Sequence, residues 1–152
     1  ITMDADLTHN PKYISKMIKL SDHYDLVQTN RFLDRRSIKT WPFYRRILTR
    51  SRFILLRFLL GINYDSSGAF RCYNFKKLDY RLLLFAKNNS YSFFWESIYI
   101  LVKEKSKIKE IKMIQKYRSI GSSKMEIKHW LHGLYYLLVI YLKDLFNISY
   151  KS

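Results

Sequence analysis

The chain has 152 residues, which is enough for one domain with a buried core. Its net charge of +16 is extreme for this size and attracts polyanions: nucleic acid, an anionic membrane surface or phosphorylated substrates. A single cysteine, Cys72, excludes an intramolecular disulfide framework and a multi-cysteine metal site, and it favours a reducing compartment.

The first eleven residues combine an apolar start, two neighbouring carboxylates and a helix start. Asn10 is a good helix N-cap, and Pro11 suits the first helical position. We therefore expect Asp4 and Asp6 at the carboxyl end of a strand, where ligands bind in open α/β sheets. Mg²⁺ and Mn²⁺ bind through one or two carboxylates plus substrate phosphates, so a metal-bridged diphosphate is one interpretation. The alternative is that Asp4 caps a turn while Asp6 is solvated.

Three predicted elements follow the acidic pair in the first half of the chain. Apolar spacing predicts a helix over residues 11–20, and residues 25–30 are typical of a short strand that ends at Arg31. The longest helical pattern runs over residues 41–61, with Gly61 as its natural stop. Along this helix, arginines recur at spacings of four and seven: Arg46, Arg50 and Arg57. Taken alone, such a stripe is typical of a solvated helix face.

The second half of the chain continues the alternation of strands and helices, which predicts an α/β fold. Strands are predicted over residues 69–73 and 108–115, and helices over residues 75–87, 93–105 and 125–147. No internal repeat or interdomain linker interrupts this succession.

The last predicted helix carries an unbroken apolar and aromatic run over residues 134–142, which ends at Lys143 and Asp144. This run is too short to cross a bilayer, because a spanning helix needs about 20 such residues. Four of its aromatic side chains are of types enriched at membrane interfaces: Trp130, Tyr135, Tyr136 and Tyr141. The pattern favours two alternatives equally, a helix in the headgroup layer or an ordinary core helix.

Several motifs occur in an order that resembles one enzyme family. The first half contains D-A-D-L-T-H-N-P-K-Y-I, a strand closing in T-x-R, W-x-x-x-R-R-I-L-T-R-S and D-S-S-G-A-F-R-C-Y. The second half contains Y-S-F-F-W-E, E-I-K-M and R-x-x-G-x-S-K-M. Their order and spacing resemble those of the dolichol-phosphate mannosyltransferases, which are inverting family 2 glycosyltransferases of the GT-A fold. The resemblance extends from residue 1 to about residue 138.

The resemblance implies a Rossmann-like α/β architecture. Residues 1–125 are expected to form a partial GT-A domain that lacks its amino-terminal nucleotide-binding half. Residues 126–152 are expected to form an amphipathic helix, with the membrane interface as one possible location. Because the chain opens inside a predicted strand and without an initiator Met, we expect it to be the carboxyl-terminal part of a longer protein. We expect the isolated 152 residues to be inactive or nearly so.

The implied reaction moves mannose from GDP-mannose to a polyprenyl or dolichyl phosphate, assisted by Mg²⁺ or Mn²⁺. The implied location is peripheral, on the cytoplasmic face of a membrane. A phosphate acceptor is already an anion near neutral pH, so no general base is required. The reaction must instead offset the repulsion between two phosphate-bearing molecules, which a divalent cation and arginines can do.

The resemblance also assigns residues to this site. Asp4 and Asp6 match the metal-binding D-x-D, with Asp6 as the principal ligand. The family can use the side chain two residues further on as another ligand, and here that residue is Thr8. Ser123 and Lys124 fall on a loop that closes over the site. The arginines that match those meeting the phosphates of donor or acceptor are Arg31, Arg50 and Arg71.

Two positions depart from the family pattern, since Lys112 replaces a proline and Phe94 replaces a glutamine. The donor also stays open, because transfer of glucose from UDP-glucose or of another nucleotide sugar is an alternative. Two other classes compete with the transferase, a nucleic-acid-binding module and a non-catalytic module that binds membranes. We find no recognisable nucleic-acid motif and expect no nucleic-acid partner.

Overall fold

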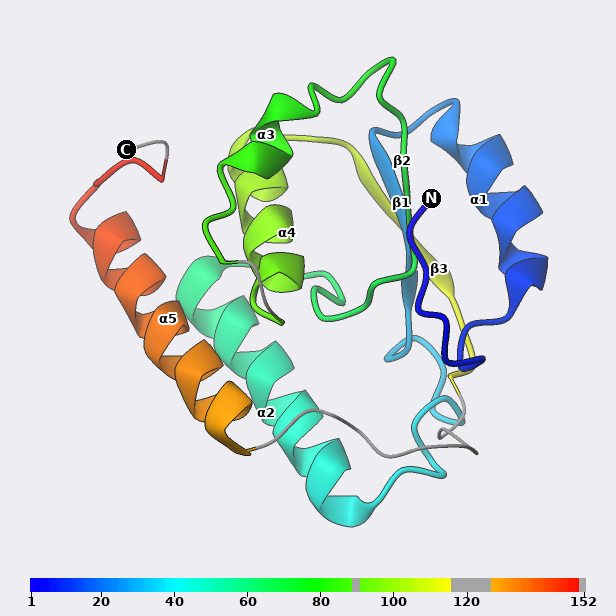
Figure 1. The fold of residues 1–152 in the computed structure, drawn as a ribbon, viewed down its shortest axis with the longest axis horizontal. Helices are drawn as coiled ribbons and strands as arrows, with labels where there is room; N and C mark the ends of the chain where they lie inside the picture. The colour runs from blue at the N-terminus through cyan, green and yellow to red at the C-terminus, as the bar shows by residue number, and fades with distance from the viewer. Residues whose placement is uncertain (89–90, 116–126, 151–152) are drawn as a thin grey trace.

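The computed structural model describes residues 1–88, 91–115 and 127–150 (Figure 1). Within these residues, a mixed sheet has the strand order β2-β1-β3. Its strands are β1 (Leu26–Asn30), β2 (Arg71–Tyr73) and β3 (Ile108–Lys112). Strand β1 is antiparallel to β2 and parallel to β3, with Gln28 opposite Arg71 on one side and Glu110 on the other. The chain therefore has the α/β class that the sequence predicts.

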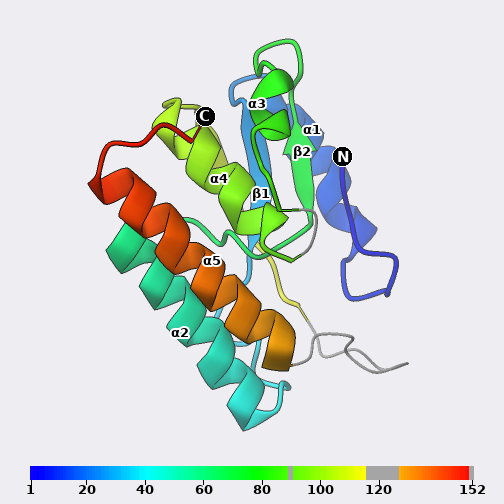
Figure 2. The ribbon, with the colours of Figure 1, turned by 60° about the vertical axis from the view of Figure 1, so that its left-hand side comes forward.

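Helices cover both faces of this sheet (Figures 1 and 2). Helix α1 (Ile14–Ser21) lies on one face, and helix α4 (Phe93–Lys103) lies on the other. Helices α2 (Phe43–Leu60) and α5 (Ile127–Leu145) lie side by side beyond α4. Two short elements complete the order, a 3-10 turn at Pro11–Tyr13 and helix α3 (Arg81–Leu84).

Two apolar cores form because successive side chains of a strand point to opposite faces. On one face, Val27 packs with Met17 of α1 and with Phe70, Cys72 and Ile111. On the other, Leu26 packs against side chains of α2, α4 and α5, including Leu56, Trp95, Ile98 and Leu137. Alternate side chains of the central strand β1 thus pack against helices on opposite faces of the sheet.

Local signals set the ends of the first two long helical segments. Asn10 accepts a hydrogen bond from the backbone N–H of Lys12 at 3.0 Å, and Pro11 occupies the first helical position, as predicted. Helix α2 ends at Gly61, whose φ of 66° lies in the left-handed region and whose N–H donates to the carbonyl of Arg57. Both predictions are confirmed.

The helix predicted over residues 75–87 is wrong, because only Arg81–Leu84 are α-helical. Two short polar side chains compete with the helix for backbone donors. Asn74 accepts from the N–H of Lys76, and Asp79 accepts from the N–H of Arg81, both at 3.0 Å. Each contact favours a local turn. The apolar residues of this segment therefore lie on successive turns and not along one continuous helix.

The opening strand is reduced to one isolated bridge between Thr2 and Arg71. The N–H of Thr2 donates to the carbonyl of Arg71 at 2.8 Å, and the N–H of Arg71 donates back at 3.1 Å. The opening segment therefore lies antiparallel beside β2, at the edge away from β1.

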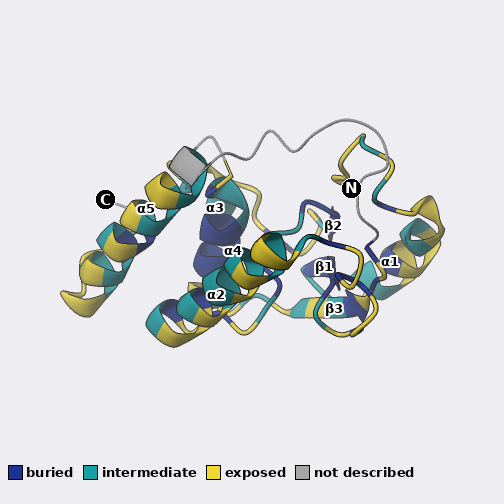
Figure 3. Cartoon of the chain, turned by 90° about the horizontal axis from the view of Figure 1, so that it is seen from below, coloured by how far each residue is buried: buried dark blue, intermediate teal, exposed yellow. Residues whose placement is uncertain are grey.

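Helix α5 begins and ends within the predicted range of 125–147. Leu137 and Ile140 are buried against the core, while its outer side is largely exposed (Figure 3). That outer side is itself apolar, with exposed Leu131, Tyr135 and Leu142. Within the described part of the chain, no helix combines the length and the apolarity that crossing a bilayer requires.

Candidate functional site

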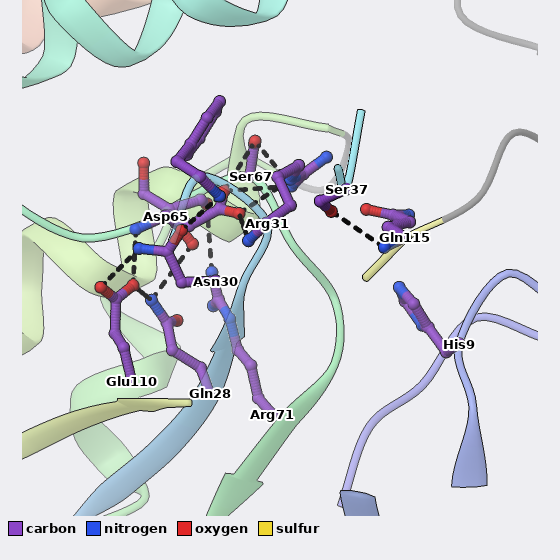
Figure 4. A network of polar contacts seen from close by, with 12 residues as sticks. His9, Gln28, Asn30, Arg31, Ser37, Asp65, Ser67, Arg71, Glu110 and Gln115 are labelled. Atoms are coloured by element: carbon purple, nitrogen blue, oxygen red, sulfur yellow. Dashed lines mark hydrogen bonds and ion pairs between the residues drawn. The ribbon is translucent and has the colours of Figure 1, made fainter. Parts of the chain in front are cut away.

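Arg31, directly after β1, is held by a carboxylate from the loop that precedes β2. Its backbone N–H and its Nε donate to Oδ2 of Asp65 at 3.1 and 2.8 Å, and its Nη2 donates to Oδ1 at 3.1 Å (Figure 4). Nη2 also donates to the hydroxyl of Ser67 at 3.0 Å. Among the described residues, Nη1 has no hydrogen-bond partner. One edge of the guanidinium is thus fixed, and the other can bind a ligand.

The charge of Asp65 acts on two guanidiniums, those of Arg31 and Arg52. Burial alone would raise the pKa of Asp65, but the charge and the hydrogen bonds of Arg31 outweigh it and lower that pKa. Burial, followed by repulsion from Arg31, lowers the pKa of Arg52 to about 10. Arg52 remains a cation at neutral pH and adds a second positive charge near Arg31.

A second carboxylate supports this cluster from strand β3. Glu110 accepts hydrogen bonds from Gln28 Nε2 at 2.8 Å, from Asn30 Nδ2 at 2.6 Å and from the backbone N–H of Asp65 at 2.7 Å (Figure 4). Burial raises the pKa of Glu110, and repulsion from Asp65 adds to this, while the three donors oppose it. The network therefore joins β1, β3 and the loop before β2.

The acidic pair lies on a tight turn. Asp6 Oδ1 accepts from the backbone N–H of Thr8 at 3.1 Å and from its hydroxyl at 2.6 Å, and Leu7 between them has a φ of 62°. The backbone N–H of Asp4 donates to Nδ1 of His9 at 3.1 Å. His9 is buried and stacks on Phe70 with 5.2 Å between ring centroids. Side-chain contacts therefore fix the turn that carries both carboxylates.

His9 connects the acidic turn to Arg31 electrostatically. Burial lowers the pKa of His9, the charges of Asp4 and Asp6 raise it, and the charge of Arg31 lowers it further. The charges of the turn and of Arg31 therefore act on the same imidazole, and the predicted grouping of the acidic pair with the three arginines stays a prediction.

The residues present fit a metal held jointly by protein and substrate. Half of the Asp4 side chain is exposed, and Oδ1 of Asp6 accepts from the backbone N–H and the hydroxyl of Thr8. Within residues 1–88, 91–115 and 127–150, no group of three His, Cys, Asp or Glu side chains lies close enough to hold a metal by itself. Mg²⁺ and Mn²⁺ commonly complete their coordination with substrate phosphates and water, so two carboxylates suffice chemically. The predicted metal role of Asp4 and Asp6 stays a prediction.

Arg71 is buried rather than presented to a ligand. Its side chain is 0% exposed, Nη1 donates to the hydroxyl of Ser97 at 2.9 Å, and Nη2 donates to the carbonyls of Phe94 and Ser66 at 2.6 and 3.1 Å. These contacts fasten β2 to the first turns of α4. Among the described residues, no interaction joins the Arg71 side chain to the acidic turn.

The remaining predicted residues lie elsewhere. Arg50 is exposed on α2, and no ion pair holds it in the described part of the chain. Ser123 and Lys124 lie outside the described residues. Among the described residues, no hydrogen bond or ion pair joins Arg31, Arg50 or the Arg71 side chain to the acidic turn. The catalytic and binding roles of all these residues remain predictions.

Sequence reasoning missed several groups at this site. Trp41 is 6% exposed, and the guanidiniums of Arg45 and Arg31 lie 4.6 and 5.8 Å from its ring. Among the described residues, its Nε1 and the Nε of Arg46 are buried donors without a partner. The missed acidic residues, Asp65 and Glu110, both lie inside quoted motifs, D-S-S-G and E-I-K-M, which was the available signal.

Comparisons with known proteins agree on one family. Residues 1–82, more than half of the chain, match the family model described as Glycosyl transferase family 2. The chain is 26% identical over 127 residues to the polyprenol monophosphomannose synthase of Mycolicibacterium smegmatis. This alignment covers 82% of this chain and 48% of that protein.

Two further relatives extend the comparison. The chain is 31% identical over 61 residues to the dolichol-phosphate mannosyltransferase of Pyrococcus furiosus, covering 40% of this chain and 17% of that protein. It is 28% identical over 130 residues to an uncharacterized protein of Methanocaldococcus jannaschii, covering 82% and 52%. The chain spans about half the length, or less, of the curated relatives that it matches.

Proposed function

Since the chain belongs to glycosyl transferase family 2, we propose that the protein containing it is a glycosyltransferase that moves mannose from GDP-mannose to a polyprenyl or dolichyl phosphate with inversion. The names of two relatives, polyprenol monophosphomannose synthase and dolichol-phosphate mannosyltransferase, support this substrate class. Transfer of glucose from UDP-glucose is the alternative within the same class. The observation that carries the proposal is the family match over residues 1–82, and the tight turn that holds Asp4 and Asp6 agrees with it.

Asp4 and Asp6 would hold Mg²⁺ or Mn²⁺ against the diphosphate of the donor. When bound, the ion offsets the charge of that diphosphate as it departs. Arg31, with its unpaired Nη1 edge, would bind the phosphate of the acceptor, whose oxygen attacks the sugar. No general base is needed, because this phosphate is already ionised.

Other donors around Arg31 support an anion at this place. Arg52 lies close enough to feel its charge, and Trp41, whose ring lies 5.8 Å from the Arg31 guanidinium, has a buried Nε1 donor that a phosphate oxygen could satisfy. We assign Arg50, which is exposed on α2, to an approaching lipid phosphate. For Arg71, the buried contacts favour a supporting role through α4. Ser123 and Lys124 are proposed to contact the donor.

We further propose that the protein works peripherally at the cytoplasmic face of a membrane. Helices α2 and α5 lie side by side (Figure 2), both have exposed surface (Figure 3), and both carry large apolar side chains that are exposed. We define the α2–α5 apolar face by its exposed residues, which are Phe43, Tyr44, Ile47, Ile54, Phe58, Leu131, Tyr135, Leu138, Leu142 and Leu145. Exposed Arg50 and Arg57 on α2, and the net charge of +16, complement anionic lipid headgroups.

A transfer assay tests the proposal on the whole protein that contains this chain. The purified protein is incubated with polyprenyl phosphate, Mg²⁺ or Mn²⁺ and either labelled GDP-mannose or labelled UDP-glucose. Label that enters the organic phase from GDP-mannose is the expected result, and label from UDP-glucose selects the alternative. No transfer from either donor, together with tight RNA or DNA binding at physiological salt, would overturn the proposal in favour of a nucleic-acid-binding module. The 152 residues alone are expected to transfer little or no sugar.

A further inference from the structure

We propose that Asp65 and Glu110 are positioning residues, which fix the guanidinium of Arg31 so that its Nη1 edge faces a phosphate. The identity of this phosphate rests on the proposed function, whereas the positioning itself does not. Neither carboxylate is expected to touch a substrate. The argument proceeds from Arg31 outward to Asp65 and then to Glu110.

Asp65 fixes the orientation of Arg31 almost completely. A guanidinium has five N–H donors, and here Nε and Nη2 are directed to Asp65 and Ser67. The backbone N–H of Arg31 donates to the same carboxylate, so side chain and main chain are fixed together. A Cβ added to Gly68 would lie 3.4 Å from Nη2, so the loop also packs closely on this side. The two N–H groups of Nη1 are the donors left for a ligand.

Glu110 does not contact the Arg31 guanidinium. It supports the loop that carries Asp65 and the turn that carries Arg31. Its Oε1 accepts from the N–H of Asp65 at 2.7 Å, and its Oε2 accepts from Asn30 Nδ2 at 2.6 Å. The other end of the Asn30 amide, Oδ1, accepts from the N–H of Phe32 at 2.6 Å. Residues 30 and 32 flank Arg31, so Glu110 shapes the turn that carries Arg31 and the loop that carries its partner.

The position of Glu110 in the sheet is one that packing alone would fill with an apolar residue. Two residues earlier on the same face, the paired positions of β1 and β3 carry Leu26 and Ile108, which belong to the apolar core. The next pair on that face is Gln28 and Glu110. An ionised carboxylate in this setting costs free energy unless several donors satisfy it, and three do.

The charges also balance before any ligand arrives. Arg31 and Arg52 contribute two positive charges, and Asp65 and Glu110 contribute two negative charges within one connected group. Loss of either carboxylate would leave two guanidiniums close together with less compensation. We therefore infer that the carboxylates keep Arg31 in place and leave the attraction of a phosphate to its free edge.

The test uses the whole protein and two independent measurements on Glu110→Gln and Asp65→Asn. The first is the ¹⁵N–¹H signal of Arg31 Nε, identified by its loss in Arg31→Lys. The second is the split between KM for polyprenyl phosphate and kcat. Glu96→Gln is the matched control, because Glu96 is also buried and also accepts three hydrogen bonds, from Lys87, Asn88 and Tyr136.

In both variants we expect the Arg31 Nε–H to exchange faster with water and KM for polyprenyl phosphate to rise about tenfold, the effect of losing one charge-assisted hydrogen bond. In an Arg31→Lys background the same substitutions should change KM less than about twofold, because they act through Arg31. The Glu96→Gln control should reproduce neither change, although it lowers stability.

An unchanged Arg31 Nε signal in Glu110→Gln, or fully additive effects with Arg31→Lys, would overturn the inference. If Glu110→Gln does not fold, Asp65→Asn decides by the same two criteria. If the unsubstituted protein transfers no sugar from either donor, the proposed function fails, and the Arg31 signal still decides the positioning role.

Discussion

The Asp65 carboxylate binds Arg31 through both its backbone N–H and its guanidinium, with a shortest contact of 2.8 Å between Oδ2 and Nε. The two residues are 34 positions apart in the sequence, and helix α2 lies between them. This contact ties the loop that follows α2 to the residue that follows β1. It therefore holds Arg31 at the end of the central strand.

The first prediction concerns the stability of Asp65→Asn. The pKa of Asp65 is lowered in the folded protein, so its carboxylate stabilises the fold above its unfolded value of 3.8, and this stabilisation is lost as pH falls through the folded value. At pH 7 we expect Asp65→Asn to lose about 3 kcal/mol of unfolding free energy, as when one partner of a buried ion pair is removed. The difference from the parent should shrink below pH 4.

Urea unfolding of the whole protein at pH 7, 5 and 3 provides this measurement. Asp22→Asn is the control, because Asp22 is exposed at the end of α1, and its effect should stay within about 0.5 kcal/mol. A constant difference between Asp65→Asn and the parent at all three pH values would contradict the linkage.

The second prediction concerns Asp6→Ala. This substitution removes a proposed metal ligand and the acceptor of both hydrogen bonds from Thr8. We expect transfer activity to fall about a hundredfold or more, since the charge of the leaving diphosphate would lose its stabilisation. Mn²⁺ binding, followed by electron paramagnetic resonance, should weaken in parallel.

Asp22→Ala serves as the matched control for this experiment, because it removes an exposed carboxylate from the end of α1. It should leave both transfer and Mn²⁺ binding unchanged. Near-normal turnover of Asp6→Ala would remove Asp6 from the proposed site.

Local patterns predicted much of the fold, because the interactions that set these elements lie within a few residues. Asn10 and Pro11 begin the first helical segment, and Gly61 ends α2, as their residue types indicate. The segment 75–87 was misread because apolar spacing does not register that Asn74 and Asp79 divert backbone donors into turns.

The site was harder to predict, because its partners are distant in sequence. The D-x-D pair and Arg31 could be identified from motifs. The residues that hold Arg31 could not be identified in this way, because Asp65 lies 34 positions away and Glu110 lies on another strand. Arg71 matches a family arginine that meets phosphate, but its buried Nη1 and Nη2 donate to protein groups, and a phosphate role for Arg71 stays a prediction.

The third prediction concerns Tyr136→Phe, which tests how α5 is held. The Tyr136 hydroxyl donates to Glu96 Oε1 at 2.7 Å, and this carboxylate is buried on α4. Removing the hydroxyl should cost about 1–2 kcal/mol of unfolding free energy, because a buried carboxylate loses one of its donors. Tyr135→Phe, at a side chain that is 66% exposed, should cost much less. Equal effects of the two substitutions in urea unfolding would contradict the role given to this contact.

The fourth prediction concerns the α2–α5 apolar face, of which Phe58 and Tyr135 are 86% and 66% exposed. A glutamate at either position places a charge where an acyl chain would contact the protein and repels anionic headgroups. We expect Phe58→Glu and Tyr135→Glu each to reduce sedimentation with vesicles containing anionic lipid by about tenfold. Ile18→Glu is the control, because Ile18 is 51% exposed on α1, at the opposite face of the sheet. If Ile18→Glu reduced vesicle binding as strongly, general charge rather than this face would govern the interaction.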